Sequence, residues 1–205
     1  WHKWNIDSYI KGAMAERRAS GKKENDLLDA LLSAGVTKVA GGLSDQQILD
    51  ELATILIAGH ETSALTMAWM FFHLAKYPAV EARLLDELRS VLRGRDATVD
   101  DVGKLPYLRA IVDECLRLYP PVWINPRIAL EDDTIAGFRI PAGTMVLIGV
   151  YFTHRRPEIW GDPDVFRPER FLERPNPDRF EFLPFGAGGR TCAGLAFAYQ
   201  EIVLA

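Results

Sequence analysis

Apolar residues recur at the three- and four-residue spacing of a helix through most of the first half of the chain. The clearest helix start is at Ser44, which is placed to form a capping box with Gln47. Leu43 and Ile48 flank this start as a hydrophobic staple. From there to about Lys76 the pattern is apolar on nearly every side, unlike that of a surface helix. The sequence therefore predicts a long, central and mostly buried helix.

Proline and glycine mark the ends of the other predicted helices. Pro78 stands where a first helical residue is favoured, apolar residues follow on one stripe, and Gly94 closes the segment. A further helix is predicted to begin near Pro106 and to stop at the Pro120–Pro121 pair. The remaining predicted helices span residues 3–19 and 25–34.

The pattern changes after Pro121, where two β-rich segments flank a plausible hairpin turn at Pro141–Gly143. The segments are Asp133–Ile140 and Thr144–Phe152, and they predict a small sheet. Beyond Pro157 the chain is rich in proline and has almost no periodic pattern until a last helix from Leu195. Long loops of this kind inside a compact domain are often functional. The expected fold class is mainly α, of the α+β type.

Composition and charge narrow the possible classes of function. The 205 residues and 48% hydrophobic content suit one domain with a sizeable core. The net charge of -4, with both signs interleaved, provides no basic stripe for a nucleic acid, so no such partner is expected. Two widely separated cysteines predict no disulfide framework and favour a reducing, cytoplasmic compartment. No apolar run reaches the roughly 20 residues that span a bilayer, so no membrane segment is expected in this chain.

Both ends of the sequence look cut. The first residue is Trp1 rather than Met, and the helical pattern over Leu195–Ala205 stops without a capping Gly or Asn. We therefore expect a C-terminal fragment of a longer protein. Any membrane anchor or targeting segment of that protein would lie outside these residues.

A glycine-rich loop, from Phe185 to Gly194, leads into the last helix with Cys192 at the junction. Glycines let the backbone approach a flat ligand closely, and the amide dipoles of a helix N-terminus favour the thiolate that a metal requires. A lone cysteine can instead be a small buried apolar residue. A dinucleotide-binding glycine loop is the other alternative, but no parallel strand or βαβ unit surrounds this one.

The loop closely resembles the cysteine-ligand signature of the cytochromes P-450: a Phe, spaced glycines, an Arg and a Cys-x-Gly ending. Three more of that family's motifs follow the family's order along the chain. Residues 58–63 resemble its oxygen-activation motif, Glu114–Arg117 its Glu-x-x-Arg motif and Pro168–Phe171 the partner of that motif. The resemblance covers nearly the whole chain, whereas the family's N-terminal half and last sheet are absent.

The resemblance implies one partial cytochrome P-450 domain over residues 1–205. Its three parts would be a helical part over 1–122, with the oxygen-activation and Glu-x-x-Arg helices, a small sheet over 123–155, and a last part over 156–205. That last part would hold the family's meander, the cysteine loop and the start of the helix behind the cofactor.

The same resemblance implies haem b, iron protoporphyrin IX, as the cofactor and Cys192 as the axial ligand of its iron. A planar guanidinium suits a haem carboxylate, which favours Arg190 first and Arg127 second. The implied cofactor-binding residues are Phe185, Gly186, Arg190, Arg127, Cys192 and Gly194.

Glu61 and Thr62 are the implied catalytic residues, which would steer protons to bound oxygen. Gly59 in mid-helix costs about 1 kcal/mol relative to Ala, so some compensation is expected. One interpretation is a local widening of the helix at which the Thr62 hydroxyl bonds the backbone or a water. The other is a patch of small residues for helix packing.

Glu114, Arg117 and Arg170 are implied to have a structural role. The first two are one helical turn apart beside an apolar stripe, which suggests a partly buried ion pair that needs further hydrogen-bonding partners. Arg170 is the partner that the resemblance implies. Cys115 lies on the same stripe and is expected to pack in the core.

The function implied by the resemblance is that of a haem-thiolate monooxygenase, which inserts one atom of dioxygen into a small hydrophobic organic substrate. A ferredoxin or a flavoprotein reductase would supply the electrons. Two alternatives stay open. One is a family member with peroxide-dependent or rearrangement chemistry, and the other is a truncated, non-catalytic and possibly inactive fragment.

Overall fold

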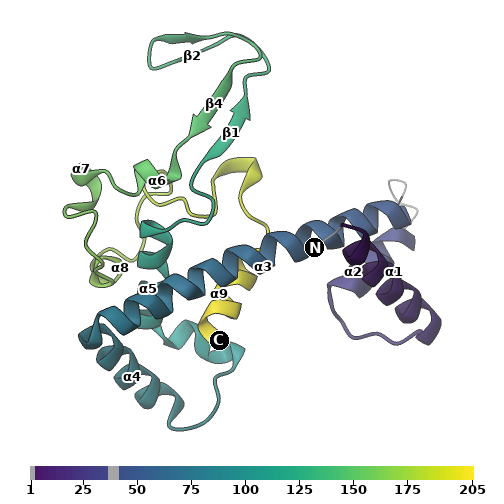
Figure 1. Ribbon diagram of the computed structural model, residues 1–205, viewed down its shortest axis with the longest axis horizontal. Coiled ribbons are helices and arrows are strands. Elements are labelled where there is room, and N and C mark those ends of the chain that lie inside the picture. The colour runs from purple at the N-terminus through teal and green to yellow at the C-terminus, as the bar shows by residue number, and fades with distance from the viewer. Residues whose placement is uncertain (1–2, 37–41) are drawn as a thin grey trace. The chain divides into compact units, whose positions relative to one another are not determined.

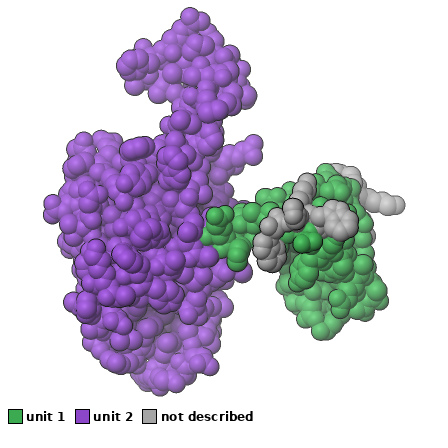
Figure 2. All heavy atoms as spheres, viewed as in Figure 1, with its two compact units in different colours: residues 1–61 green, residues 62–205 purple. Residues whose placement is uncertain are grey.

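The computed structural model describes residues 3–36 and 42–205 and divides into two compact units, the first ending at Glu61 and the second beginning at Thr62 (Figure 2). Helices dominate both units, and the strands form two small antiparallel pairs (Figure 1). The expected α+β class is therefore confirmed. Within the described residues, no helix is both long and apolar enough to cross a lipid bilayer.

The first unit holds α1 (Lys3–Ser20), α2 (Leu27–Val36) and the start of α3 (Asp45–Lys76). The predicted capping box is confirmed, because the Ser44 N–H donates to Gln47 Oε1 at 2.8 Å and the Gln47 N–H donates to Ser44 Oγ at 3.3 Å. The core of this unit is small. It consists of Ile10, Met14, Ile48 and Leu49.

The length of α3 agrees with the prediction, but the expected burial is wrong for the residues described. Several of its large apolar side chains are between 43% and 56% exposed. They are Ile55, Leu56, Ile57, Leu65, Phe71 and Phe72. The buried positions in the second half of the helix recur at helical spacing and form one stripe of Ser63, Thr66, Met70 and His73.

The second unit is built around α5 (Pro106–Leu118), which is buried on almost every side. Pro78 and Pro106 are first helical residues, as predicted. The core of this unit joins α5 to residues of α3, α4 and α9, including Met70, Leu84, Ile111 and Val203. Its other helices are α4 (Pro78–Leu92), η2 (Val99–Lys104), α6 (Val150–Thr153), α7 (Pro157–Trp160), α8 (Glu169–Glu173), η3 (Gly188–Arg190) and α9 (Leu195–Leu204).

The strand pairing differs from the predicted hairpin. β2 (Asp133–Ile135) pairs with β3 (Phe138–Ile140), and β1 (Asn125–Ile128) pairs with β4 (Met145–Ile148). The turn at Pro141–Gly143 therefore joins two strands that are not partners. The hairpin turn lies instead at Ala136 and Gly137, which both have positive φ, as a tight two-residue turn between antiparallel strands requires. Residues 150–152, predicted to be extended, lie in α6 (Val150–Thr153).

Candidate functional site

Cys192 lies in a loop whose backbone is closed by hydrogen bonds. The Cys192 N–H donates to the Phe185 carbonyl at 2.9 Å, and the Gly186 N–H donates to the Leu183 carbonyl at 3.0 Å. Gly186 and Gly188 have φ values of 72° and 75°, in the region that favours glycine. The Cys192 side chain is exposed, whereas the other cysteine, Cys115, is buried as expected.

The chemistry of this loop fits a haem. Across residues 3–36 and 42–205, no group of three or more His, Cys, Asp or Glu side chains could hold a metal ion. An exposed thiol in a glycine loop would suit an iron that takes its remaining ligands from its own macrocycle. A Cβ at Gly194 would lie 3.8 Å from Cys192 Sγ, at ordinary van der Waals distance, so this glycine borders the sulfur.

Arg127 and Arg190 are both exposed, and neither forms an ion pair with a carboxylate of the described residues. Arg127 lies on β1, where its guanidinium donates to the neighbouring Pro126 carbonyl at 2.8 Å. Arg190 ends the short η3 helix within the cysteine loop. No hydrogen bond joins the two side chains. Each guanidinium is therefore free to meet a carboxylate outside these residues.

The structure brings Glu114, Arg117 and Arg170 together in a buried cluster. The Arg117 guanidinium donates two bonds to the Glu114 carboxylate, at 2.8 and 2.9 Å, and both side chains are fully buried. Arg170 Nε donates to Glu114 Oε1 at 3.3 Å, and the Arg167 N–H donates to the same oxygen at 2.8 Å. The pair is thus more deeply buried than the sequence suggested, and its charges are fully hydrogen-bonded.

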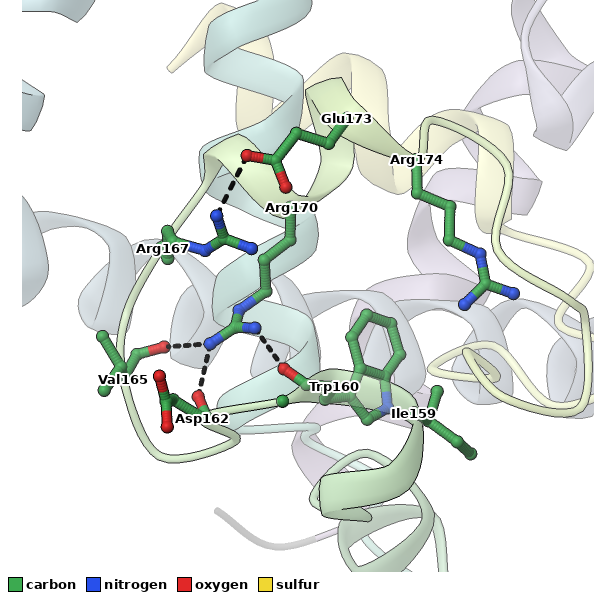
Figure 3. Close-up of a pocket in the computed structure, with 9 residues that line it drawn as sticks. Ile159, Trp160, Asp162, Val165, Arg167, Arg170, Glu173 and Arg174 are labelled. Carbon is green, nitrogen blue, oxygen red and sulfur yellow. Dashed lines mark hydrogen bonds and ion pairs between the residues drawn. The ribbon is translucent and has the colours of Figure 1, made fainter.

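The two arginines of the cluster also hold the loop that follows α7. Figure 3 shows the Arg170 guanidinium turned toward the carbonyl oxygens of Trp160, Asp162 and Val165. Arg117 donates to the Pro163 carbonyl at 2.7 Å. Burial lowers the pKa of Arg170, and the Glu114 carboxylate opposes that shift. The cluster therefore satisfies backbone acceptors of a segment that has little regular structure of its own.

His154 is a residue of this region that the motifs did not identify. Its carbonyl accepts from Arg117 at 2.9 Å, and its Nε2 accepts the Leu183 N–H at 2.9 Å. The imidazole is fully buried. His154 therefore links the buried cluster to the residues that precede the cysteine loop. A lone histidine carries no sequence signal for such a role, because its partners are backbone atoms far away in the chain.

The stability of the protein should depend on pH through His154. Burial lowers the pKa of His154 from 6.5 to about 4. The unfolded state binds the His154 proton more tightly than the folded state does. The contribution of neutral His154 to the stability of the fold is therefore complete above pH 6.5 and is lost as the pH falls toward 4. The lowered pKa of His154 corresponds to roughly 3 kcal/mol in the free energy of unfolding.

The measurement is urea unfolding of the full-length protein across this pH range. His154→Gln keeps an acceptor near the Leu183 N–H and should flatten the dependence, whereas His60→Gln, at an exposed histidine, should leave it unchanged. A steep fall that persists in His154→Gln would assign the effect to other groups.

Glu61 and Thr62 are consecutive residues of α3, with Glu61 exposed and Thr62 half-buried. The helix is regular α-helix throughout, so the expected local widening is not present. The other interpretation, a patch of small residues for helix packing, is not supported either. A Cβ on Gly59 would meet no described atom within 4 Å. The Thr62 carbonyl accepts from Thr66 Oγ1 at 2.9 Å, a contact that the motif did not reveal.

The family model for Cytochrome P-450 matches residues 3–205. Together with the cysteine loop and the buried Glu114 cluster, this match defines the class of protein. The chain belongs to the cytochrome P-450 family.

Curated relatives agree with this assignment. The chain is similar to cyclooctat-9-en-7-ol 5-monooxygenase of Streptomyces melanosporofaciens, with 41% identity over 201 residues, covering 97% of this chain and 43% of the relative. Cyclooctatin synthase of the same species is 40% identical over 182 residues, covering 88% and 40%. Pentalenene oxygenase of Streptomyces avermitilis is 37% identical over 202 residues, covering 96% and 44%. The chain thus spans about two fifths of the length of these relatives.

Proposed function

We propose that the protein containing this chain is a haem-thiolate monooxygenase, in which Cys192 is the axial ligand of haem b. The observation that carries the proposal is the exposed Cys192 thiol in a hydrogen-bonded glycine loop, within a chain of this family. When bound, the haem supplies the iron that binds dioxygen and performs the oxygen transfer. The relatives named as a monooxygenase and an oxygenase support the same reaction class.

Each of the proposed site residues has a distinct task. The Cys192 thiolate donates electron density to the metal, and the carboxylates of the cofactor bind Arg190 and Arg127. Phe185, Gly186 and Gly194 shape the loop around the sulfur. Glu61 and the Thr62 hydroxyl hold and pass protons on the oxygen side.

A small, apolar organic substrate fits this proposal, since the relatives' names specify cyclooctat-9-en-7-ol and pentalenene for those enzymes. Electrons would come from a separate ferredoxin or flavoprotein reductase.

The test is a carbon monoxide difference spectrum of the reduced full-length protein. A thiolate ligand moves the main absorption band of the carbon monoxide complex to a long wavelength that a neutral ligand does not produce. We expect this band, followed by oxygen-dependent product formation when a reductase and an apolar substrate are added. A haem protein without the band would overturn the proposal, and so would product formation that needs peroxide but no oxygen.

Replacing Thr62 by alanine in the full-length protein should leave haem binding intact and divert reducing equivalents into peroxide. The reason is that the Thr62 hydroxyl is the proposed holder of a proton-relay water. The measurement is product formed per NAD(P)H consumed. Thr54→Ala is a matched control, because Thr54 is an exposed threonine of the same helix whose hydroxyl donates to the Asp50 carbonyl at 2.7 Å. Equal coupling in both variants would remove Thr62 from the proton path.

A further inference from the structure

The helix that follows the cysteine loop is held by a buried hydrogen bond that no motif covers. The Tyr199 hydroxyl of α9 donates to Asp113 Oδ1 of α5 at 2.6 Å, and both side chains are at least nine-tenths buried. The other Asp113 oxygen accepts from Arg109 Nε at 2.9 Å. The Arg109 guanidinium lies 3.3 Å from the centroid of the Tyr199 ring. Three side chains therefore form one closed cluster between the two helices.

The protonation states of this cluster agree with the direction of its hydrogen bond. Burial raises the pKa of Tyr199, so the phenol keeps its proton and acts as the donor. Burial also raises the pKa of Asp113, while Arg109 opposes that change. A bond as short as 2.6 Å is typical of a hydroxyl that donates to a carboxylate.

Tyr199 also contacts the cysteine loop directly. Its ring packs against Phe185 with the ring centroids 5.3 Å apart. The Phe185 carbonyl is the acceptor for the Cys192 N–H at 2.9 Å. Tyr199 thus touches both the carboxylate on α5 and the residue whose backbone closes the loop around the thiol.

The position of Asp113 in the sequence strengthens this connection. Asp113 and Glu114 are consecutive residues of α5. One binds a segment that precedes the cysteine loop in the sequence, and the other binds a segment that follows it. Glu114 binds Arg170 before the loop, and Asp113 binds Tyr199 after it. Figure 1 shows α9 close to α5, and the two helices share the core of this unit. The loop is therefore anchored at both ends to one helix.

We propose that Tyr199, held by Asp113, is a positioning residue that fixes Cys192 in the orientation in which its sulfur binds the metal. This inference rests on the proposed function, in which Cys192 is the thiolate ligand. The Tyr199 hydroxyl acts through the ring, the Phe185 carbonyl and the Cys192 backbone, without touching the cofactor.

The test uses Tyr199→Phe, which removes the hydroxyl and keeps the ring against Phe185. In the reduced carbon monoxide complex, the band of the thiolate-ligated form should give way to the band of the form that has lost its thiolate ligand. This conversion should be roughly tenfold faster than in the wild type, as expected for the loss of one buried hydrogen bond to a charged group. Asp113→Ala should have the same effect. The double variant should add little to Asp113→Ala, because that change already removes the Tyr199–Asp113 bond together with the Arg109 contact.

Tyr107→Phe is the matched control. Tyr107 is a buried tyrosine of α5, the helix that carries Asp113, and its hydroxyl donates to the Glu169 carboxylate at 3.0 Å, so the same kind of bond is lost away from the cysteine loop. This control should lower the unfolding temperature and leave the rate of band conversion unchanged. Equal acceleration in both phenylalanine variants would show a general effect on stability and overturn the proposal, as would an unchanged rate in Tyr199→Phe.

A second measurement does not depend on the cofactor. In the haem-free protein, Tyr199→Phe should change the rate of Cys192 alkylation several-fold relative to wild type and to Tyr107→Phe, because the surroundings of the exposed thiol change with the loop, with buried Cys115 as the internal reference. An unchanged alkylation rate would contradict the positioning role. A wild type that binds haem without the thiolate band would contradict the proposed function instead, so the two failures are distinguishable.

Discussion

Replacing Arg117 by methionine is expected to destabilise the folded protein by about 3–5 kcal/mol. The change leaves the Glu114 carboxylate fully buried without its bidentate partner, and the Arg170 and Arg167 contacts cannot replace two bonds of 2.8 and 2.9 Å. It also removes the donor for the His154 and Pro163 carbonyls. The measurement is urea unfolding of the full-length protein, with stability taken from the midpoint and slope.

The chain offers a matched control for this prediction. Asp86 and Arg89 on α4 form an ion pair of the same i,i+3 spacing, but their side chains are 76% and 72% exposed. Arg89→Met should therefore change stability by less than about 1 kcal/mol. Adding Glu114→Gln to Arg117→Met should recover part of the loss, since it removes the unpaired buried charge. Equal midpoints for Arg117→Met and Arg89→Met would show that the buried cluster does not stabilise the fold.

Replacing Cys192 by alanine is expected to abolish the thiolate band of the reduced carbon monoxide complex and, with it, the proposed monooxygenase activity. Within these 205 residues the other cysteine, Cys115, is buried and cannot replace it. Burial also raises the pKa of the Cys115 thiol, which disfavours the anionic form that a metal binds.

Cys115→Ala is the control for this prediction. It removes the other thiol from the core, so it should lower stability and keep the band. The assignment of Cys192 fails if the purified Cys192→Ala protein retains the band.

Local signals in the sequence were sufficient for most helix boundaries and for the motifs. A capping box at Ser44 and prolines at first helical positions, Pro78 and Pro106, act within one turn of the chain, so their effect can be predicted without knowing the fold. The glycine loop around Cys192 is equally local. These features place the candidate ligand at the start of a helix and identify the family resemblance.

Tertiary structure decided the pairing and burial of the rest. Ala136 and Gly137 turn the β2–β3 hairpin, whereas the Pro141–Gly143 turn joins strands with other partners, and turn residues alone do not specify which strands pair. The Tyr199–Asp113 bond links residues 86 positions apart. Burial and distant hydrogen bonds depend on which segments meet in space, and the sequence pattern of one segment does not contain that information.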